Sequence, residues 1–119
     1  MSVIEYLRKL KRCVTGDEPP KSPSYALDEL DYRLEPFLDF KDGFFIEVGA
    51  NDGISQSNTL YFERHKGWTG LLIEPIPKLA EKCRDNRPDC IVEQAALVSD
   101  GYSEETVEMR YCDLMSLVK

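Results

Sequence analysis

The chain has 119 residues, of which 42% are hydrophobic and 31% are charged, and its formal net charge is −7. This composition is typical of one globular domain and excludes a disordered chain, and no run approaches the roughly 20 apolar residues of a membrane-spanning helix. Because the negative charge repels phosphate backbones, we do not expect a nucleic-acid partner.

The cysteines Cys13, Cys83, Cys90 and Cys112 accompany the single histidine, His65, and no two of them form a C-x-x-C pair. A metal site is therefore not expected, because a structural zinc ion needs four clustered Cys or His ligands. The apolar residues at the start of the chain are interrupted by charges, unlike those of a cleavable signal. We therefore expect free thiols in a reducing, cytoplasmic setting.

The chain divides into an N-terminal segment at 1–14, a linker at 15–24 and the domain itself at 25–119. Within the first segment, residues 2–14 are expected to form a short amphipathic helix. Arg8, Lys9, Lys11 and Arg12 make one side of the helix basic, as in a helix that lies on a membrane surface, but a helix that packs on protein is the favoured interpretation. Its apolar face consists of Val3, Ile4, Leu7, Leu10 and Val14.

Residues 25–40 have apolar side chains at helical spacing, with Pro36 placed to end or kink the helix. The acids on the opposite face are expected to be solvated. The apolar positions are Leu27, Leu30, Leu34, Phe37 and Leu38.

Three apolar stretches alternate with two amphipathic ones. Residues 43–50, 68–75 and 90–98 predict strands, and residues 55–67 and 76–87 predict helices. Strands joined by helical crossovers form a parallel sheet. The near-continuous apolar runs further predict a sheet covered on both faces.

The ends of these elements also have recognisable residues. Ser55 or Ser57 can cap the start of the first helix, Gly67 is placed to end it, and Pro77 suits the first turn of the second. Residues 99–105 predict a turn. The alternating residues 106–112 then predict one extra, half-exposed strand.

The loop "EVGANDG" after the first strand is the candidate binding loop. An Asp-Gly pair often forms a hairpin, but here a helix follows Gly53. Gly49 allows a tight turn, and Gly53 allows the helix and the strand to pack closely. Asn51 stands where a dinucleotide fingerprint has its second glycine, which argues against NAD or FAD.

Two acids flank this loop. Glu74 ends the second strand about 20 residues after Gly53, where a carboxylate can accept hydrogen bonds from ribose hydroxyls. Glu47 lies inside an apolar strand and needs a partner. That partner is either the positive amino group of a cofactor or a structural donor of the chain. A ribose and an amino group without phosphate suit S-adenosyl-L-methionine.

The segments "EVGANDG", "SNT", "GWTGLLIEP" and "NRP…AAL" resemble the cofactor-binding half of the FkbM-type S-adenosylmethionine-dependent methyltransferases, over about residues 25–98. The resemblance implies an α/β, three-layer Rossmann-like class I fold, cut after its first three parallel strands plus one extra strand. It also implies O-methylation of a hydroxyl on a sugar, a polyketide or another small molecule.

The same resemblance implies which residues bind the cofactor. Glu47, Gly49, Ala50, Asn51 and Gly53 would surround the methionine moiety, and Ser57, Asn58 and Thr59 would stand at the helix start. Glu74 would hold the ribose, and Pro75, Ala95 and Ala96 would line the adenine.

No catalytic base is assigned. His65 lies near a helix end and Asp52 lies in a turn, and both are weak candidates. The chain also stops before the Asp-containing segment with which the family continues, so the first strand is expected to be an open apolar edge through which the chain can self-associate. The remaining alternatives are an inactive fragment that acts by association and a nucleotide-binding Rossmann domain.

Overall fold

The computed structural model of the chain describes residues 3, 22–110, 112 and 117–118. The predicted N-terminal helix, except Val3, and most of the linker lie outside the described residues. No helix in the described ranges has the length and apolar character needed to cross a membrane. The elements in chain order are η1 (Leu27–Glu29), α2 (Leu30–Leu34), η2 (Glu35–Phe37), β1 (Phe44–Val48), α3 (Leu60–Lys66), β2 (Thr69–Ile73), α4 (Pro77–Asn86), β3 (Ile91–Glu93), β4 (Met109–Arg110) and β5 (Leu117–Val118).

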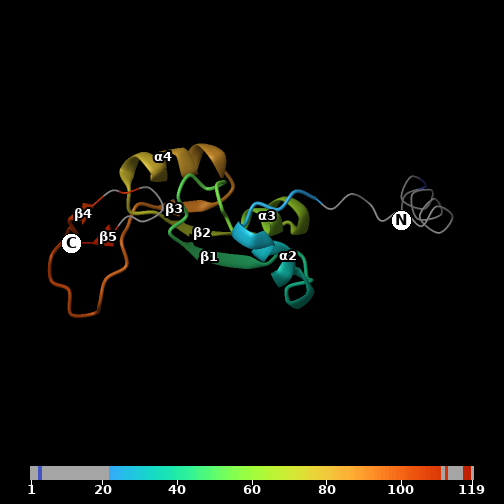
Figure 1. The fold of residues 1–119 in the computed structure, drawn as a ribbon, viewed down its shortest axis with the longest axis horizontal. Coiled ribbons are helices and arrows are strands. Elements are labelled where there is room, and N and C mark those ends of the chain that lie inside the picture. The colour runs from blue at the N-terminus through green and yellow to red at the C-terminus, as the bar shows by residue number, and fades with distance from the viewer. Residues whose placement is uncertain (1–2, 4–21, 111, 113–116, 119) are drawn as a thin grey trace.

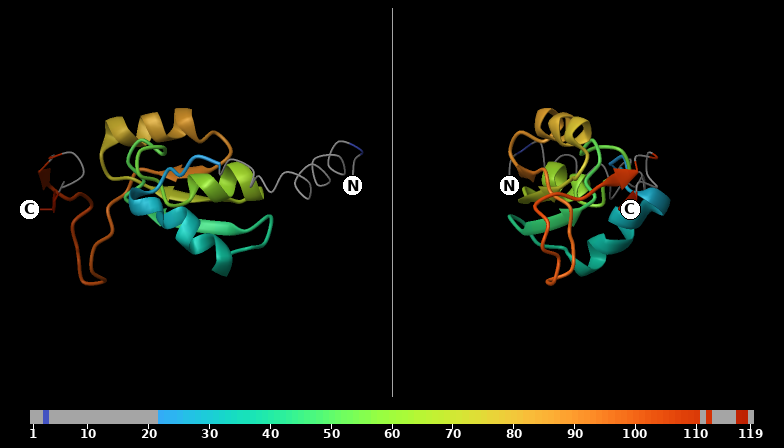
Figure 2. Two further views of the ribbon diagram at one scale, coloured as in Figure 1. Left: turned by 45° about the vertical axis from the view of Figure 1, so that its right-hand side comes forward. Right: turned by 90° about the vertical axis from the view of Figure 1, so that its left-hand side faces the viewer.

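Strands β1, β2 and β3 form a parallel sheet in that order, with α3 and α4 as the crossovers (Figure 1). Phe44 is the register partner of Thr69, and Ile73 is the partner of Glu93. Both crossover helices lie on the same side of the sheet (Figure 2). The predicted parallel sheet is therefore confirmed, and the hairpin interpretation of Gly53 is excluded.

The core lies between this sheet and the helices α3 and α4, and aromatic rings meet on its α3 side. Phe62 contacts Tyr61 and Trp68, with ring centroids 5.4 and 5.1 Å apart. Trp68 is buried, and its indole N–H donates a 2.8 Å hydrogen bond to the carbonyl of Phe40. The buried core residues are Phe45, Ala50, Tyr61, Phe62, Trp68, Leu72 and Cys83.

The predicted ends of the crossover helices are largely confirmed. Helix α3 ends at Gly67, whose φ of 70° is the left-handed conformation that glycine adopts at least cost. Helix α4 begins at Pro77. Helix α3 begins later than predicted, at Leu60, and its N-cap residue is Thr59, not Ser55 or Ser57. The hydroxyl of Ser57 nevertheless accepts the N–H of Leu60 at 3.1 Å. Ser55 instead bonds Asp52.

The single helix predicted over residues 25–40 is wrong, because the structure has three short helices there, the α-helix α2 and the 3-10 helices η1 and η2. Asp28 and Glu29 have φ of 51° and 53°, which breaks the helix. Asp31 is also buried and not solvated, since its carboxylate accepts the hydroxyl of Ser24 at 2.6 Å and the N–H of Tyr25 at 2.8 Å. Burial raises the pKa of Asp31, but these hydrogen bonds outweigh that effect and lower it.

The apolar positions predicted in this segment divide into two groups. Leu34 and Leu38 pack against the core as expected. Leu27 and Phe37 are 59% and 83% exposed, which contradicts the expected helical face. The broken helix explains the difference, because residues in separate turns no longer share one face.

The third strand is shorter than predicted. Strand β3 ends at Glu93, opposite the last residue of β2, so residues 94–98 have no neighbouring strand to pair with and are irregular. The extra strand predicted at 106–112 is reduced to β4, which pairs with β5 in a separate two-stranded antiparallel sheet.

One face of the parallel sheet is open, so the prediction that both faces are covered is wrong for the described residues. Phe44, Ile46 and Val48 of β1 are 60%, 64% and 56% exposed, and Ile91 of β3 is 57% exposed. We call these four residues the open face. Strand β1 is also the edge of the sheet, which confirms the expected apolar edge.

Replacing Gly70 by alanine is expected to destabilise the fold by about 1–3 kcal/mol, because a Cβ there would overlap the ring and the carbonyl of Phe45. Urea denaturation measures the change in the free energy of unfolding. Gly101→Ala is the matched control, since a Cβ at Gly101 has no atom within 4 Å. Equal unfolding midpoints for the two variants would contradict the packing described for β1 and β2.

Candidate functional site

The loop after β1 closes onto the end of β2. The N–H groups of Gly49 and Ala50 donate to the carbonyl of Ile73 at 2.8 and 3.0 Å. Gly49 and Gly53 have φ of 76° and 82°, and Asn51 has φ of 53°. Asparagine tolerates this left-handed conformation better than most residues, so Asn51 preserves the turn.

Glu74 links the ends of β1 and β2. Its side chain is buried, and its Oε2 accepts the N–H of Asn51 at 2.8 Å, while Oε1 accepts the N–H of Ile76 at 3.0 Å. An ionised carboxylate has about four acceptor positions, so two amide donors leave it able to accept hydroxyl hydrogens as well. Glu74 therefore fixes the loop and retains capacity for a ligand.

Glu47 is satisfied by donors of the chain itself. Its carboxylate accepts the N–H of Asn58 at 2.8 Å and the hydroxyls of Ser57 and Thr59 at 3.0 and 2.6 Å. Four predicted site residues are thereby brought together at the end of β1. Two partners were considered for Glu47, and the structure shows the donors of the chain itself. A contact between Glu47 and the amino group of a cofactor stays a prediction.

Arg87, just after α4, is completely buried below this loop. It pairs with the carboxylate of Glu63 and donates to the carbonyl of Gly53 at 2.9 Å. Its other donors reach the hydroxyls of Ser57 and Thr59 at 3.3 and 3.2 Å. The Arg87 side chain therefore connects the end of α4 to α3 and to the loop through its hydrogen bonds.

A cavity of about 630 Å³ lies beyond the ends of β2 and β3, and we call it the β3 cavity. Three predicted site residues, Pro75, Ala95 and Ala96, line it, and their side chains make part of its wall apolar. Its volume is in the range of small-molecule sites. The other lining residues are Ile76, Pro77, Gln94, Val98, Tyr102, Glu104, Glu105, Thr106, Val107 and Met109.

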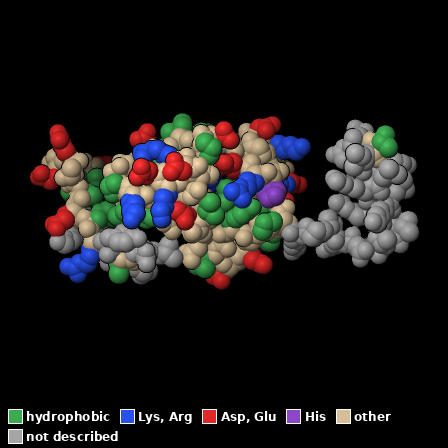
Figure 3. All heavy atoms as spheres, turned by 90° about the horizontal axis from the view of Figure 1, so that it is seen from above, with side chains coloured by type: hydrophobic (Ala, Val, Ile, Leu, Met, Phe, Trp, Pro, Cys, Tyr) green, Lys and Arg blue, Asp and Glu red, His purple; other side chains and the backbone are tan. Residues whose placement is uncertain are grey.

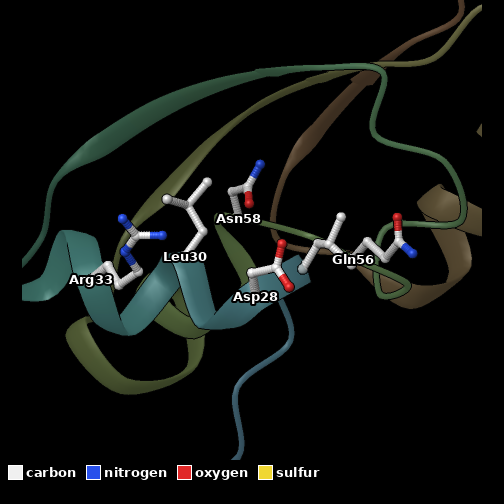
Figure 4. Close-up of a pocket in the computed structure, with 6 residues that line it drawn as sticks. Asp28, Leu30, Arg33, Gln56 and Asn58 are labelled. Carbon is white, nitrogen blue, oxygen red and sulfur yellow. The ribbon is translucent and has the colours of Figure 1, made fainter.

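A second cavity, of about 370 Å³, lies between η1, α2 and the loop before α3, and we call it the η1 cavity (Figure 4). Asn58 is the predicted site residue on its wall. The complete lining is Leu27, Asp28, Leu30, Arg33, Gln56 and Asn58.

The side chains of Asp52 and His65, the two weak candidates for a catalytic base, both contact other residues of the chain in ways that have structural roles. Asp52 accepts the N–H groups of Ile54 and Ser55 at 2.9 and 2.7 Å, as a turn residue does. Burial raises the pKa of Asp52, but these hydrogen bonds outweigh it and lower the pKa. His65 is exposed and packs on Tyr61, with the two ring centroids 5.0 Å apart.

Within the described ranges, no group of three or more Cys, His, Asp or Glu residues is arranged to hold a metal ion.

A family model described as "Methyltransferase FkbM domain" matches residues 47–116, which is more than half of the chain. The chain belongs to the FkbM methyltransferase family. The predicted family and cofactor are thereby confirmed, as is the predicted resemblance to a methyltransferase, and S-adenosyl-L-methionine is the methyl donor that this family uses. The predicted fold class is also confirmed: the sheet consists of the first three parallel strands of a Rossmann-like fold.

Two solved structures are similar to this FkbM chain in backbone. A TehB-like SAM-dependent methyltransferase from Corynebacterium glutamicum ATCC 13032 Kitasato has 12% identity and a TM-score of 0.43. A SAM-dependent methyltransferase from Thiobacillus denitrificans, in complex with S-adenosyl-L-homocysteine, has 14% identity and a TM-score of 0.47. The alignments cover 76% and 79% of this chain but only 42% and 39% of those chains. No curated protein matches the chain.

Sequence reasoning missed the part that Arg87 plays in this FkbM domain. Arginine is rarely buried, and nothing in its local pattern indicates burial. The sequence feature that could have indicated it is the "NRP" segment, which contains Arg87 and contributes to the family resemblance. That resemblance assigned no contact to the Arg87 side chain. Glu63 was missed for the same reason, since its partner is 24 residues away in the chain.

Arg87→Gln is expected to destabilise the FkbM domain by about 3–5 kcal/mol, because the carboxylate of Glu63 and the carbonyl of Gly53 would lose their cationic donor. Arg84→Gln, on the exposed side of α4, is the matched control and is expected to stay within about 0.5 kcal/mol. Chemical denaturation measures both changes. Similar midpoints for the two variants would contradict the buried position of Arg87.

The stability of the domain is expected to fall as the pH rises from about 9 to 11. Burial raises the pKa of the Cys83 thiol from 9.0 to about 11, and burial with a hydrogen bond to Glu63 does the same for Cys90. Between those pH values the unfolded chain loses protons that the folded chain keeps, which favours unfolding. Urea denaturation at a series of pH values measures the slope.

The double variant Cys83→Ala/Cys90→Ala isolates the thiol contribution to that slope. Tyr61 acts in the same direction above pH 10, since burial and a hydrogen bond to Glu35 raise its pKa to about 12. The variant should therefore retain a shallower decline. An unchanged slope in the variant would show that the thiols do not cause it.

Proposed function

We propose that this chain binds S-adenosyl-L-methionine along the carboxyl edge of its sheet and, as part of an O-methyltransferase, directs the methyl group to a hydroxyl of a small molecule. The observation that supports the proposal most is the position of Glu74. A buried carboxylate with spare acceptor capacity stands between the loop after β1 and the β3 cavity. Membership of the FkbM family supports the reaction class.

The β3 cavity fits the adenine end of the cofactor. Pro75 and Ala96 offer apolar surface on which a flat ring can pack, and Ala95 and Gln94 lie on the same wall. A volume of about 630 Å³ accommodates a nucleoside. In this proposal, the adenine is bound by shape and apolar contact, and the backbone of residues 94–96 sets the size of the cavity.

Glu74 fits the ribose. Both of its oxygens already accept one backbone N–H, so the carboxylate cannot rotate away from the edge of the sheet. Its remaining acceptor positions suit the two ribose hydroxyls, each bond being worth about 1.5–3 kcal/mol. Asn51 is fixed by the same carboxylate, so ribose binding and loop position depend on one residue.

The residues after β1 fit the proposed site in two different ways. Gly49 has open space where a Cβ would be, and this leaves the backbone accessible to a ligand. Gly53, in contrast, is packed, because a Cβ there would lie 2.9 Å from Arg87 and 3.0 Å from Cys83. Glu47 acts through Ser57 and Thr59, whose positions it fixes, and so we propose it as a positioning residue.

The chemistry assigned to the chain is positioning. The bound cofactor supplies a sulfonium-activated methyl group, and the acceptor supplies the nucleophilic oxygen. Alignment of two reactants in one site accounts for much of the acceleration of such a displacement. Because the chain spans 42% and 39% of the two solved methyltransferases, the acceptor contacts and a base are proposed to come from segments other than the described residues.

The proposed partner is a hydroxylated small molecule and not a nucleic acid. On the face shown in Figure 3, acidic and basic side chains are interspersed, which does not favour a phosphate backbone. We propose a cytoplasmic setting, which the free thiols of Cys83 and Cys90 support, since a reducing compartment keeps thiols free.

A second candidate function, association, is favoured by the open face. Phe44, Ile46 and Val48 form an exposed apolar row on an edge strand, which is a surface that self-association or a partner would cover. Concentration-dependent oligomers, measured by analytical ultracentrifugation, without any binding of S-adenosylhomocysteine would favour this candidate over the methyltransferase.

The methyltransferase proposal is tested by calorimetric titration of the chain with S-adenosylhomocysteine. Glu74→Ala is expected to weaken binding by about 1.5–3 kcal/mol, the scale of a hydrogen bond to a charged acceptor. Glu81→Ala, an exposed acid on α4, is the control and should bind like the original chain. Circular dichroism shows whether each variant is folded.

Two outcomes would contradict the proposal. A folded chain that binds no S-adenosylhomocysteine would leave association as the better candidate. Preference for NADH in a competition titration would instead favour a dinucleotide-binding Rossmann domain, despite Asn51 at the position of the second glycine.

A further inference from the structure

The η1 cavity has charges of opposite sign on its wall. Figure 4 shows Arg33 toward one end of the cavity and Gln56 toward the other, with Asn58 and Asp28 between them. Leu30 adds apolar surface to the wall. A cavity with a cation at one end and an anion near its middle matches a ligand whose anionic and cationic groups lie side by side in the same order.

These charged groups have no ion-pair partner within the described part of the chain. The ion pairs found there use Lys66 and Arg87 as cations, and neither Arg33 nor Asp28 takes part in one. The side chains of Gln56 and Asn58 likewise form no hydrogen bond with another residue of the described ranges. Among the described residues, all four polar groups are therefore available to a ligand.

The backbone around the cavity is held in an uncommon conformation. Asp28, Glu29 and Gln56 have φ of 51°, 53° and 59°, which side chains other than glycine, asparagine and aspartate adopt at a cost. A backbone bridge between Ala26 and Gln56 joins the two walls. Such conformations persist where the surrounding structure fixes them, and they fix in turn the direction of the side chains.

The η1 cavity is linked to β1 through Asn58, whose N–H donates to Glu47. Its residues come from η1, α2 and the loop before α3, whereas the β3 cavity is built from residues after β2 and β3. Glu74 and the loop at 49–53 belong to the ends of the two strands in between. The N–H of Asn58 is fixed by Glu47, which leaves the Asn58 side chain for the cavity.

We propose that the η1 cavity binds the zwitterionic amino-acid end of the cofactor, with its α-carboxylate at Arg33 and Asn58 and its α-ammonium at Asp28. The proposal rests on the proposed function. A guanidinium can bind a carboxylate through two parallel N–H donors, and Asp28 is an acceptor for an ammonium. Glu47, already bonded to three donors of the chain, then positions Asn58 and does not contact the ammonium itself.

The test compares two ligands that differ in the amino-acid end alone. S-Adenosylhomocysteine has that end, and 5′-methylthioadenosine lacks it. Arg33→Gln and Asp28→Asn are each expected to weaken binding of S-adenosylhomocysteine about 10- to 100-fold and to leave binding of 5′-methylthioadenosine unchanged. Asparagine tolerates the positive φ of Asp28, so Asp28→Asn changes the charge with little effect on the turn.

Matched controls separate a local contact from a change in overall charge. Lys41→Gln and Glu81→Gln remove one exposed charge of each sign away from both cavities and should leave both ligands unaffected. Arg33→Lys keeps the charge without the planar fork of donors, and it should restore part of the lost affinity.

Each result has a clear meaning. If the variants at Arg33 and Asp28 bind S-adenosylhomocysteine as the controls do, or lose both ligands equally, the assignment of the η1 cavity is wrong while the proposed function stands. If the original chain binds neither ligand and Glu74→Ala changes nothing, the proposed function and this inference are both wrong.

Discussion

A buried relay of hydroxyl groups between an anion and a cation is the interaction on which the site depends. Ser57 and Thr59 each donate to Glu47 and each accept from Arg87, so two hydroxyls with a single hydrogen apiece have their orientation fixed from both sides. Glu63 completes the pairing of Arg87. Because buried charges are tolerated only when they are paired and hydrogen-bonded, loss of any one member leaves others unsatisfied, and the loop between β1 and α3 loses its anchor.

This anchor explains how a loop with few glycines holds a defined shape. The loop is attached at one end to β2 through Glu74 and at the other to α4 through Arg87. Between these points the chain needs positive φ at Gly49 and Gly53, and Asn51 supplies a third such residue. The η1 cavity is lined by residues that follow this loop, and the β3 cavity is lined by residues that follow β2 and β3. A ligand that extends from one cavity to the other would therefore contact a surface that is organised before binding, which reduces the entropy lost on association.

The sequence predicted the parts of this arrangement that depend on local pattern. The order of strands and helices, the end of α3 at Gly67 and the start of α4 at Pro77 follow from periodicity and backbone preference, and all are present. The parts that failed depend on distant partners. The burial of Arg87 and Asp31 results from donors and acceptors that only the folded chain brings together, and the early end of β3 results from the end of β2. The positive φ of Asp28 and Glu29 is likewise not indicated by the helical spacing of residues 25–40.

The alternation of β1 links the open face to the site. Ile46 and Val48 point to the uncovered side of the sheet, and Glu47, between them, points to the buried relay. Covering the apolar side would stabilise the strand by about 25 cal/mol for each Å² removed from water. Any segment or partner that covers this face therefore also stabilises the strand that positions Glu47, and through it Asn58 at the η1 cavity. By linkage, a ligand that binds the ordered loop favours the covered state by the same free energy, so cofactor binding and association at the open face are coupled whenever both occur.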